Sequence, residues 1–158
     1  MNKSKSHSIA TAAMIAALYV ILTYLASLFG LASSSIQVRF SEALCILPVF
    51  MPSAIPGLFV GCFISNMISG CLIPDIIFGS IATLIGALGT YLLRKKPILS
   101  LLPPIIANTA IIPFVLMYAY GIRPIWFSMI TVCIGEIISC GILGMLLYSV
   151  LKRYRNLI

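Results

Sequence analysis

The chain has 158 residues, of which 61% are hydrophobic and only 8% are charged, and its mean hydropathy is +1.17. A water-soluble domain carries about 25% charged residues, so the composition excludes a soluble enzyme and a disordered segment. The net charge of +7 lies mostly in short clusters between apolar runs, which argues against nucleic acid as a partner. We therefore expect one integral membrane domain over residues 1–158.

The first apolar run, Ile9–Gly30, is long enough to cross a bilayer, which takes about 20 residues. It is too long for a typical signal peptide, and no clean small-residue cleavage site follows it. Prolines then divide the next apolar region into Ser41–Met51 and Ile55–Ile68. These segments either cross separately or form a re-entrant hairpin. We favour two crossings, because a hairpin needs protein cover on every side.

Three further spans are predicted at Ile73–Leu93, Ile98–Tyr120 and Pro124–Leu151. With both termini in the cytoplasm, only two basic residues, Arg39 and Arg123, lie outside. The basic residues inside are then Lys3, Lys5, Arg94, Lys95, Lys96, Lys152, Arg153 and Arg155. This strong positive-inside bias predicts a compact, all-α bundle of six transmembrane helices in the bacterial plasma membrane.

Polar side chains within these spans are candidate functional groups, because an ionised acid at mid-membrane costs about 2.5–3.5 kcal/mol on insertion scales. The outer segment before the second span contains Arg39 and Glu42, which would share one face of a helix. They are either ligand-facing groups or a simple interfacial ion pair.

Two other acids stand out. Asp75 follows Pro74 at the outer start of the fourth span, where it either caps the helix or binds a ligand with Asn66 across a short turn. Glu136 lies deep in the last span, and Asn108 near the middle of the fifth. The simplest explanation for these two polar residues within the spans is a hydrogen bond between helices. We expect no Lys or Arg at that depth, so Glu136 is either protonated or partnered by a ligand or ion.

A site with several carboxylates and little basic charge suits a cationic ligand or one rich in N–H donors, such as a guanine-like edge. The aromatic residues on the same outer side form a membrane-interface belt, or stack in part on a planar ligand. They are Tyr118, Tyr120, Trp126 and Phe127.

No enzyme, metal or cofactor signature is present. The five cysteines lie in or beside apolar runs without a C-x-x-C pair, and His7 is the only histidine. No nucleotide-binding motif occurs, so we expect any ATP to be used by another chain.

Small residues four apart allow helix backbones to approach closely, either within the chain or against a partner membrane protein. They are Ala12 with Ala16, Ala13 with Ala17, and Gly57 with Gly61.

Three stretches carry a family resemblance: QVRFSEAL at 37–44, IPGLFVGC at 55–62 continuing to Asn66, and DIIFGSIATL at 75–84. In them the chain resembles the QueT family, the substrate-binding S-components of energy-coupling factor (ECF) importers associated with queuosine precursors. The resemblance covers nearly the whole chain but is most distinctive over residues 36–84.

The resemblance implies a six-helix protein that encloses its substrate near the outer face, under the loop Leu31–Phe40. It implies a transmembrane coupling subunit and two cytoplasmic ATPases as partners, with Ala12/Ala16 or Ala13/Ala17 on the coupling face. The implied ligand is a 7-deazaguanine such as 7-aminomethyl-7-deazaguanine. We therefore predict substrate binding by Arg39, Glu42, Asn66, Asp75, Asn108 and Glu136. The alternatives are an S-component for another vitamin-like solute, a stand-alone proton-coupled carrier using Glu136, and a membrane scaffold.

Overall fold

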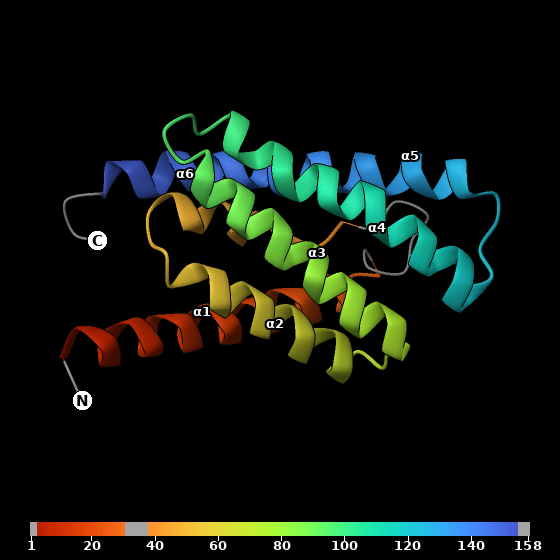
Figure 1. The fold of residues 1–158 in the computed structure, drawn as a ribbon, viewed down its shortest axis with the longest axis horizontal. Coiled ribbons are helices and arrows are strands. Elements are labelled where there is room, and N and C mark those ends of the chain that lie inside the picture. Colours follow the sequence, from red (N-terminus) through yellow and green to blue (C-terminus); the bar gives the residue numbers. More distant parts are fainter. Residues whose placement is uncertain (1–2, 31–37, 155–158) are drawn as a thin grey trace.

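The computed structural model describes residues 3–30 and 38–154, and within these ranges all regular secondary structure is helical (Figure 1). Most of the predicted loop Leu31–Phe40 lies outside the described residues. The elements are α1 (Lys3–Leu28), the 3₁₀ helix η1 (Phe40–Val49), α2 (Ala54–Ile68), α3 (Ile73–Leu92), the short η2 (Leu99–Leu101), α4 (Leu102–Tyr120), α5 (Ile125–Glu136), the π-helical segment η3 (Ile137–Leu143) and α6 (Gly144–Arg153).

The predicted all-α membrane bundle is confirmed. Four helical stretches are long and apolar enough to cross a membrane. They are Lys5–Leu28, Ile73–Leu92, Leu99–Tyr120 and Ile125–Arg153; the last joins α5, η3 and α6 into one rod. The other two segments, η1 and α2, are apolar but shorter. Most of η1 is buried against α1, α3, η3 and α6, so protein rather than lipid surrounds its backbone.

Helix α4 contains three prolines, of which Pro113 lies in the helix interior and the other two lie where a helix tolerates them. Pro103 and Pro104 occupy the first turn of α4, where a missing backbone N–H removes no intrahelical hydrogen bond. The helix ends at Gly121, whose φ of 68° is a left-handed conformation that glycine adopts without steric cost.

Helices α1 and α2 meet along a seam of small residues. A Cβ atom added at Gly57 would lie 2.7 Å from the Ala12 carbonyl oxygen, and one at Gly61 would lie 3.0 Å from the Cα of Ala16. The Ala12/Ala16 pair therefore packs inside the chain, as small-x-x-x-small pairs commonly do. Ala13 and Ala17 lie on the exposed side of the same helix.

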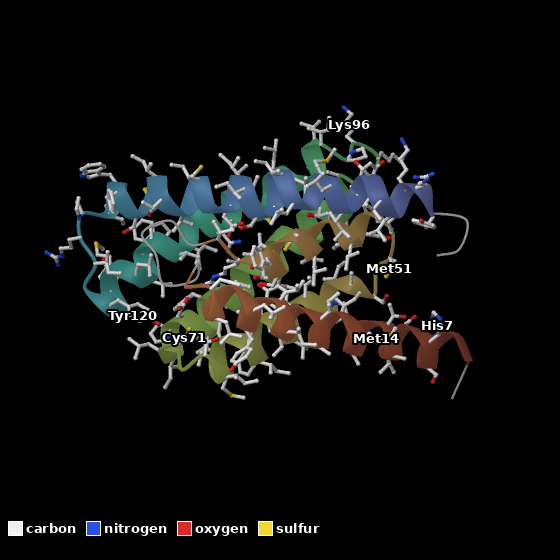
Figure 2. The ribbon with its side chains drawn as sticks, turned by 180° about the vertical axis from the view of Figure 1, so that it is seen from behind. His7, Met14, Met51, Cys71, Lys96 and Tyr120 are labelled. Carbon is white, nitrogen blue, oxygen red and sulfur yellow. The ribbon has the colours of Figure 1, made fainter. Side chains whose placement is uncertain are left out.

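The two ends of the bundle differ in charge. The start of α1 and the end of α6 lie at the same end (Figure 1), together with Lys96 and His7, whereas Tyr120 and Cys71 lie at the other (Figure 2). The positive-inside rule assigns the end with the basic clusters to the cytoplasm.

Candidate functional site

A cavity of about 270 Å³ opens at the end of the bundle away from the basic clusters. We call it the outer cavity. Polar side chains from α1, α2 and α3 face it, and α4 closes one side. Its lining consists of Thr23, Ser27, Arg39, Asn66, Ser69, Cys71, Asp75, Leu116, Tyr120 and Ile122.

Asp75 is the acid of the outer cavity. Helix α3 begins at Ile73 and Pro74, immediately before it, so the carboxylate lies in the first helical turn, and only 5% of the residue is exposed. The Tyr120 hydroxyl donates a hydrogen bond of 3.2 Å to Oδ2, and the same hydroxyl accepts one of 3.1 Å from the Leu72 N–H. Asp75 Oδ1 is buried and has no hydrogen-bond partner among the described residues. One acceptor of this carboxylate is therefore open.

Asn66 lies beside Asp75, as the short turn between α2 and α3 predicts. Its amide nitrogen is 3.5 Å from the Asp75 backbone oxygen and 3.6 Å from the Cys62 sulfur. Ordinary N–H···O bonds are about 2.7–3.2 Å long, so these contacts hold the amide weakly. The Asn66 amide nitrogen therefore lies at the outer cavity as a donor without a short N–H···O bond among the described residues.

Arg39 is the cation of the site and precedes η1. Its backbone N–H donates a hydrogen bond of 3.1 Å to Ser139 Oγ on η3, which ties this segment to the last helix. Burial lowers the pKa of the Arg39 guanidinium, but the nearby Asp75 carboxylate raises it, and the result lies above the ordinary value. Arg39 therefore carries a full charge beside the cavity.

Arg39 also lines a second, very small void of about 10 Å³ with Asn108, Ile112, Val132 and Glu136. The expectation that no basic residue reaches the depth of Glu136 is therefore wrong. It failed because Arg39 is placed by an irregular segment that packs between the helices, not by a membrane span. Asn108 Nδ2 is buried here without a hydrogen-bond partner among the described residues.

Glu42 lies apart from both spaces, in what we call the acid–thiol cluster of Tyr19, Glu42, Cys45, Glu136 and Cys140. The Tyr19 hydroxyl donates to Glu42 Oε1, and the Cys45 thiol lies 3.1 Å from Oε2. The Cys140 thiol lies 3.3 Å from both Glu136 Oε2 and the Glu42 backbone oxygen. The wider turn of η3 carries Cys140 and Ser139, and π-helical turns are frequent at functional sites.

Donor atoms of Glu42, Cys45 and Cys140 all lie within 4.8 Å of one another, a grouping that the expectation of no metal site did not anticipate. The hydrogen bonds within the cluster already account for this proximity. The geometry therefore gives no separate reason to place a cation there.

The structure thus divides the six residues predicted to bind substrate. Arg39, Asn66 and Asp75 line the outer cavity; Arg39, Asn108 and Glu136 surround the small void; Glu42 lines neither. Sequence reasoning missed Thr23 and Ser27, although polar residues four apart share a helix face, which is a usable signal. Of the outer aromatic residues, only Tyr120 lines the outer cavity, whereas Tyr118 and Trp126 are 81% and 60% exposed.

Comparisons with known proteins agree on one family. A family model described as the QueT transporter matches residues 9–153. The curated protein "Queuosine precursor transporter QueT" of Lactococcus lactis subsp. cremoris (strain MG1363) is 41% identical over 85 residues, which are 54% of this chain and 50% of that protein. The matched segment thus spans about half the length of this curated relative. No solved structure matches the chain significantly.

Proposed function

Because the chain belongs to the QueT transporter family, and is thus a multi-pass membrane transport protein rather than an enzyme, we propose that it is the substrate-binding subunit of an ATP-driven ECF importer. In this proposal it captures a queuosine precursor from outside the cell. The name of the relative from Lactococcus lactis supports this substrate class. The main support for the proposal is the buried Asp75 carboxylate at the outer cavity, of which one oxygen has no hydrogen-bond partner among the described residues.

The ligand we propose is a 7-deazaguanine such as 7-aminomethyl-7-deazaguanine. Sites for drug-sized ligands measure about 300–1,000 Å³, so a cavity of about 270 Å³ suits a small, planar molecule. A guanine-like edge offers N–H donors, which Asp75 Oδ1 would accept, and carbonyl and ring acceptors, which the Asn66 amide and Arg39 would satisfy. The aminomethyl group lies on the five-membered ring, away from that edge, so its cation would suit a second acidic group.

Glu136 and Asn108 have a less direct role in this proposal. The void beside them has room for about one water molecule at most, and Arg39 lies between it and the outer cavity. Direct contact with the ligand would require the Arg39 side chain to move. We therefore assign first contact to Asp75, Asn66 and Arg39, and keep Glu42, Asn108 and Glu136 as predicted residues of the wider site.

Binding to the purified full chain tests the substrate. Titration with 7-aminomethyl-7-deazaguanine should show saturable binding that Asn66→Leu and Asp75→Asn weaken. Tyr118→Phe, on an exposed tyrosine of the same end, is the matched control and should bind normally. Absence of binding by the folded wild-type chain to any deazapurine would refute the substrate assignment.

The coupling to ATP hydrolysis needs partners, which in this proposal are a transmembrane coupling subunit and two cytoplasmic ATPases. The exposed Ala13 and Ala17 offer the free small-residue face, because Ala12 and Ala16 are used against α2. Co-expression should therefore give a complex that Ala13→Leu weakens. Leu18→Ile, at an exposed position on the same helix, is the control.

Reconstituted vesicles separate this mechanism from the alternatives. ATP-dependent uptake that requires all subunits supports the importer. Uptake by the chain alone, abolished by an uncoupler, would instead establish a proton-coupled carrier that uses Glu136. Absence of uptake under every condition would favour a membrane scaffold.

A further inference from the structure

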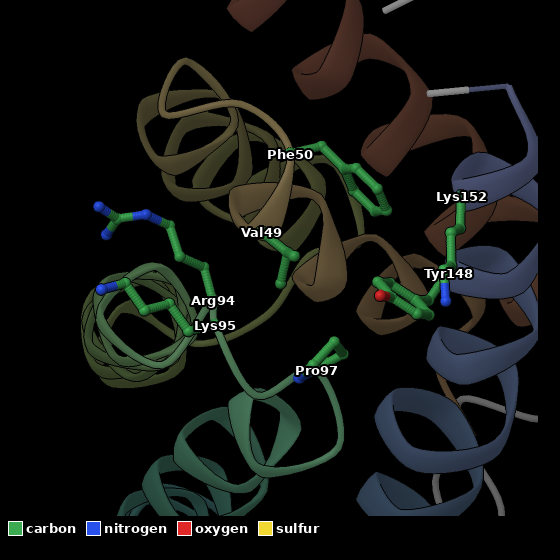
Figure 3. A pocket seen from close by; sticks show the side chains of 7 residues that line it. All are labelled: Val49, Phe50, Arg94, Lys95, Pro97, Tyr148 and Lys152. Atoms are coloured by element: carbon green, nitrogen blue, oxygen red, sulfur yellow. The ribbon is translucent and has the colours of Figure 1, made fainter. Parts of the chain in front are cut away.

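A second cavity, of about 670 Å³, lies at the other end of the bundle (Figure 3). We call it the basic pocket. The end of η1, the α3–α4 connection and α6 surround it. Its lining consists of Val49, Phe50, Arg94, Lys95, Pro97, Tyr148 and Lys152. It shares no residue with the outer cavity, so its role is separate from substrate capture.

The basic pocket combines an apolar floor with a charged rim. The rings of Phe50 and Tyr148 pack at a centroid distance of 5.4 Å and an angle of 33°, and both residues are half-buried. Figure 3 shows Lys152 beside Tyr148, while the side chains of Arg94 and Lys95 extend outward from the end of α3. All three basic residues are exposed. The charged ends of Lys95 and Lys152 can reorient toward a bound group, whereas Arg94 would first have to leave its contacts with Tyr91.

No acidic side chain balances this charge within the pocket. The three acids of the chain are Glu42, Asp75 and Glu136, and all of them are buried elsewhere. Arg94 donates to the Tyr91 backbone oxygen and lies 4.1 Å above the Tyr91 ring, and neither contact brings a negative charge from the described residues. Among the described residues, Lys95 and Lys152 have no recorded ion pair. Three basic residues therefore border one concave surface without a counter-ion from this part of the chain, Lys152 beside Tyr148 and Arg94 and Lys95 with their charged ends directed away from it.

The position of the basic pocket at one end of the bundle brings it close to negatively charged groups. The positive-inside bias puts this end at the cytoplasmic membrane surface, where anionic lipids are abundant and basic pockets between helices bind their head groups. We propose that the basic pocket binds a phosphate-bearing anion, with the Lys152 ammonium and the Tyr148 hydroxyl as its first donors and Arg94 and Lys95 closing over it. The phosphate comes from an anionic lipid or from a soluble phosphate, and the two sources are separable by experiment.

The experiment compares the purified full chain in vesicles of phosphatidylcholine with the chain in equal parts of phosphatidylcholine and phosphatidylglycerol. Native mass spectrometry after extraction should show phosphatidylglycerol retained by the wild type. The double variant Lys95→Gln/Lys152→Gln should weaken apparent affinity by about fivefold per lysine, and so about thirtyfold together. Lys95→Arg/Lys152→Arg should retain affinity, which also shows that these positions tolerate substitution.

The matched control is Lys5→Gln/Arg123→Gln, which removes the same net charge outside the pocket. It should bind like the wild type; an equal loss in both double variants would show only general surface attraction and overturn the proposal. Titration with inorganic phosphate identifies the source, since displacement of the lipid shows that soluble phosphate uses the same pocket. Equal behaviour in both vesicle types, with no response to phosphate, would also overturn it.

Discussion

Asp75 and Glu42 are both buried acids, but their surroundings differ. Both carboxylate oxygens of Glu42 are engaged, by the Tyr19 hydroxyl and the Cys45 thiol, and no recorded cavity within the described residues reaches them. Asp75 has one oxygen engaged by Tyr120 and one without a partner in the part of the chain that the structure describes, and it lines the outer cavity. Burial alone therefore does not mark a binding residue. An open acceptor beside a cavity is the more informative feature.

Replacing the two acids tests this difference most strongly. Asp75→Asn should weaken deazaguanine binding by about tenfold to 150-fold, because a hydrogen bond to a charged group contributes about 1.5–3 kcal/mol. Glu42→Gln should reduce the affinity much less than Asp75→Asn does in protein that remains folded, because Glu42 does not line the outer cavity. Isothermal titration of both variants makes the measurement. An equal loss in the two variants would erase the distinction and bring Glu42 into direct contact with the ligand.

Tyr19→Phe should have its effect on folding rather than on binding. The change leaves Glu42 Oε1 buried without its donor, which costs about 1–3 kcal/mol of unfolding free energy. Denaturant titration in detergent measures the loss. Tyr24→Phe, at a residue that is 57% exposed on the same helix, is the control and should be neutral. Unchanged stability in Tyr19→Phe would show that the acid–thiol cluster is not closed in solution.

Tyr120→Phe should have a smaller effect, of about twofold to tenfold in affinity, because one neutral hydrogen bond is worth about 0.5–1.5 kcal/mol. Tyr120 positions the carboxylate by holding Asp75 Oδ2 and does not need to touch the ligand. In the Asp75→Asn background the same change should therefore cost much less. Full additivity of the two losses would mean that Tyr120 contacts the ligand independently.

Cys71 gives the mildest test, by chemical labelling of the outer cavity. Burial raises the pKa of its thiol, and the nearby Asp75 charge raises it further. The reactive thiolate is therefore scarce at neutral pH. The alkylation rate of Cys71 should still increase at a pH at which the alkylation rate of an exposed thiol no longer changes. Bound ligand should slow the reaction, and Cys71→Ser identifies the labelled site. Labelling at a free-thiol rate, with no protection, would contradict the cavity's role in binding.

Much of the fold could be predicted from the sequence, because long apolar runs bounded by basic clusters leave few arrangements in a membrane. The proximity of Asn66 and Asp75 was also predictable, since only a short turn separates their helices. The depth of Arg39 was not, because an irregular segment and a 3₁₀ helix place it, and neither follows a hydropathy period. The cluster of Glu42 with Cys140 depends on the π-helical segment η3 between α5 and α6, which no residue pattern predicts.

The seam between α1 and α2 has a mechanical consequence. No side chain fits into it at Gly57 or Gly61, where an added Cβ would lie 2.7 Å from an atom of α1, so the two backbones pack in direct contact. We expect the two helices to move together as one lever. One surface of this lever displays Ala13 and Ala17 to the surroundings, and its far end holds Asn66 against Asp75. A displacement of Ala13 and Ala17 would therefore be transmitted to Asn66 and Asp75.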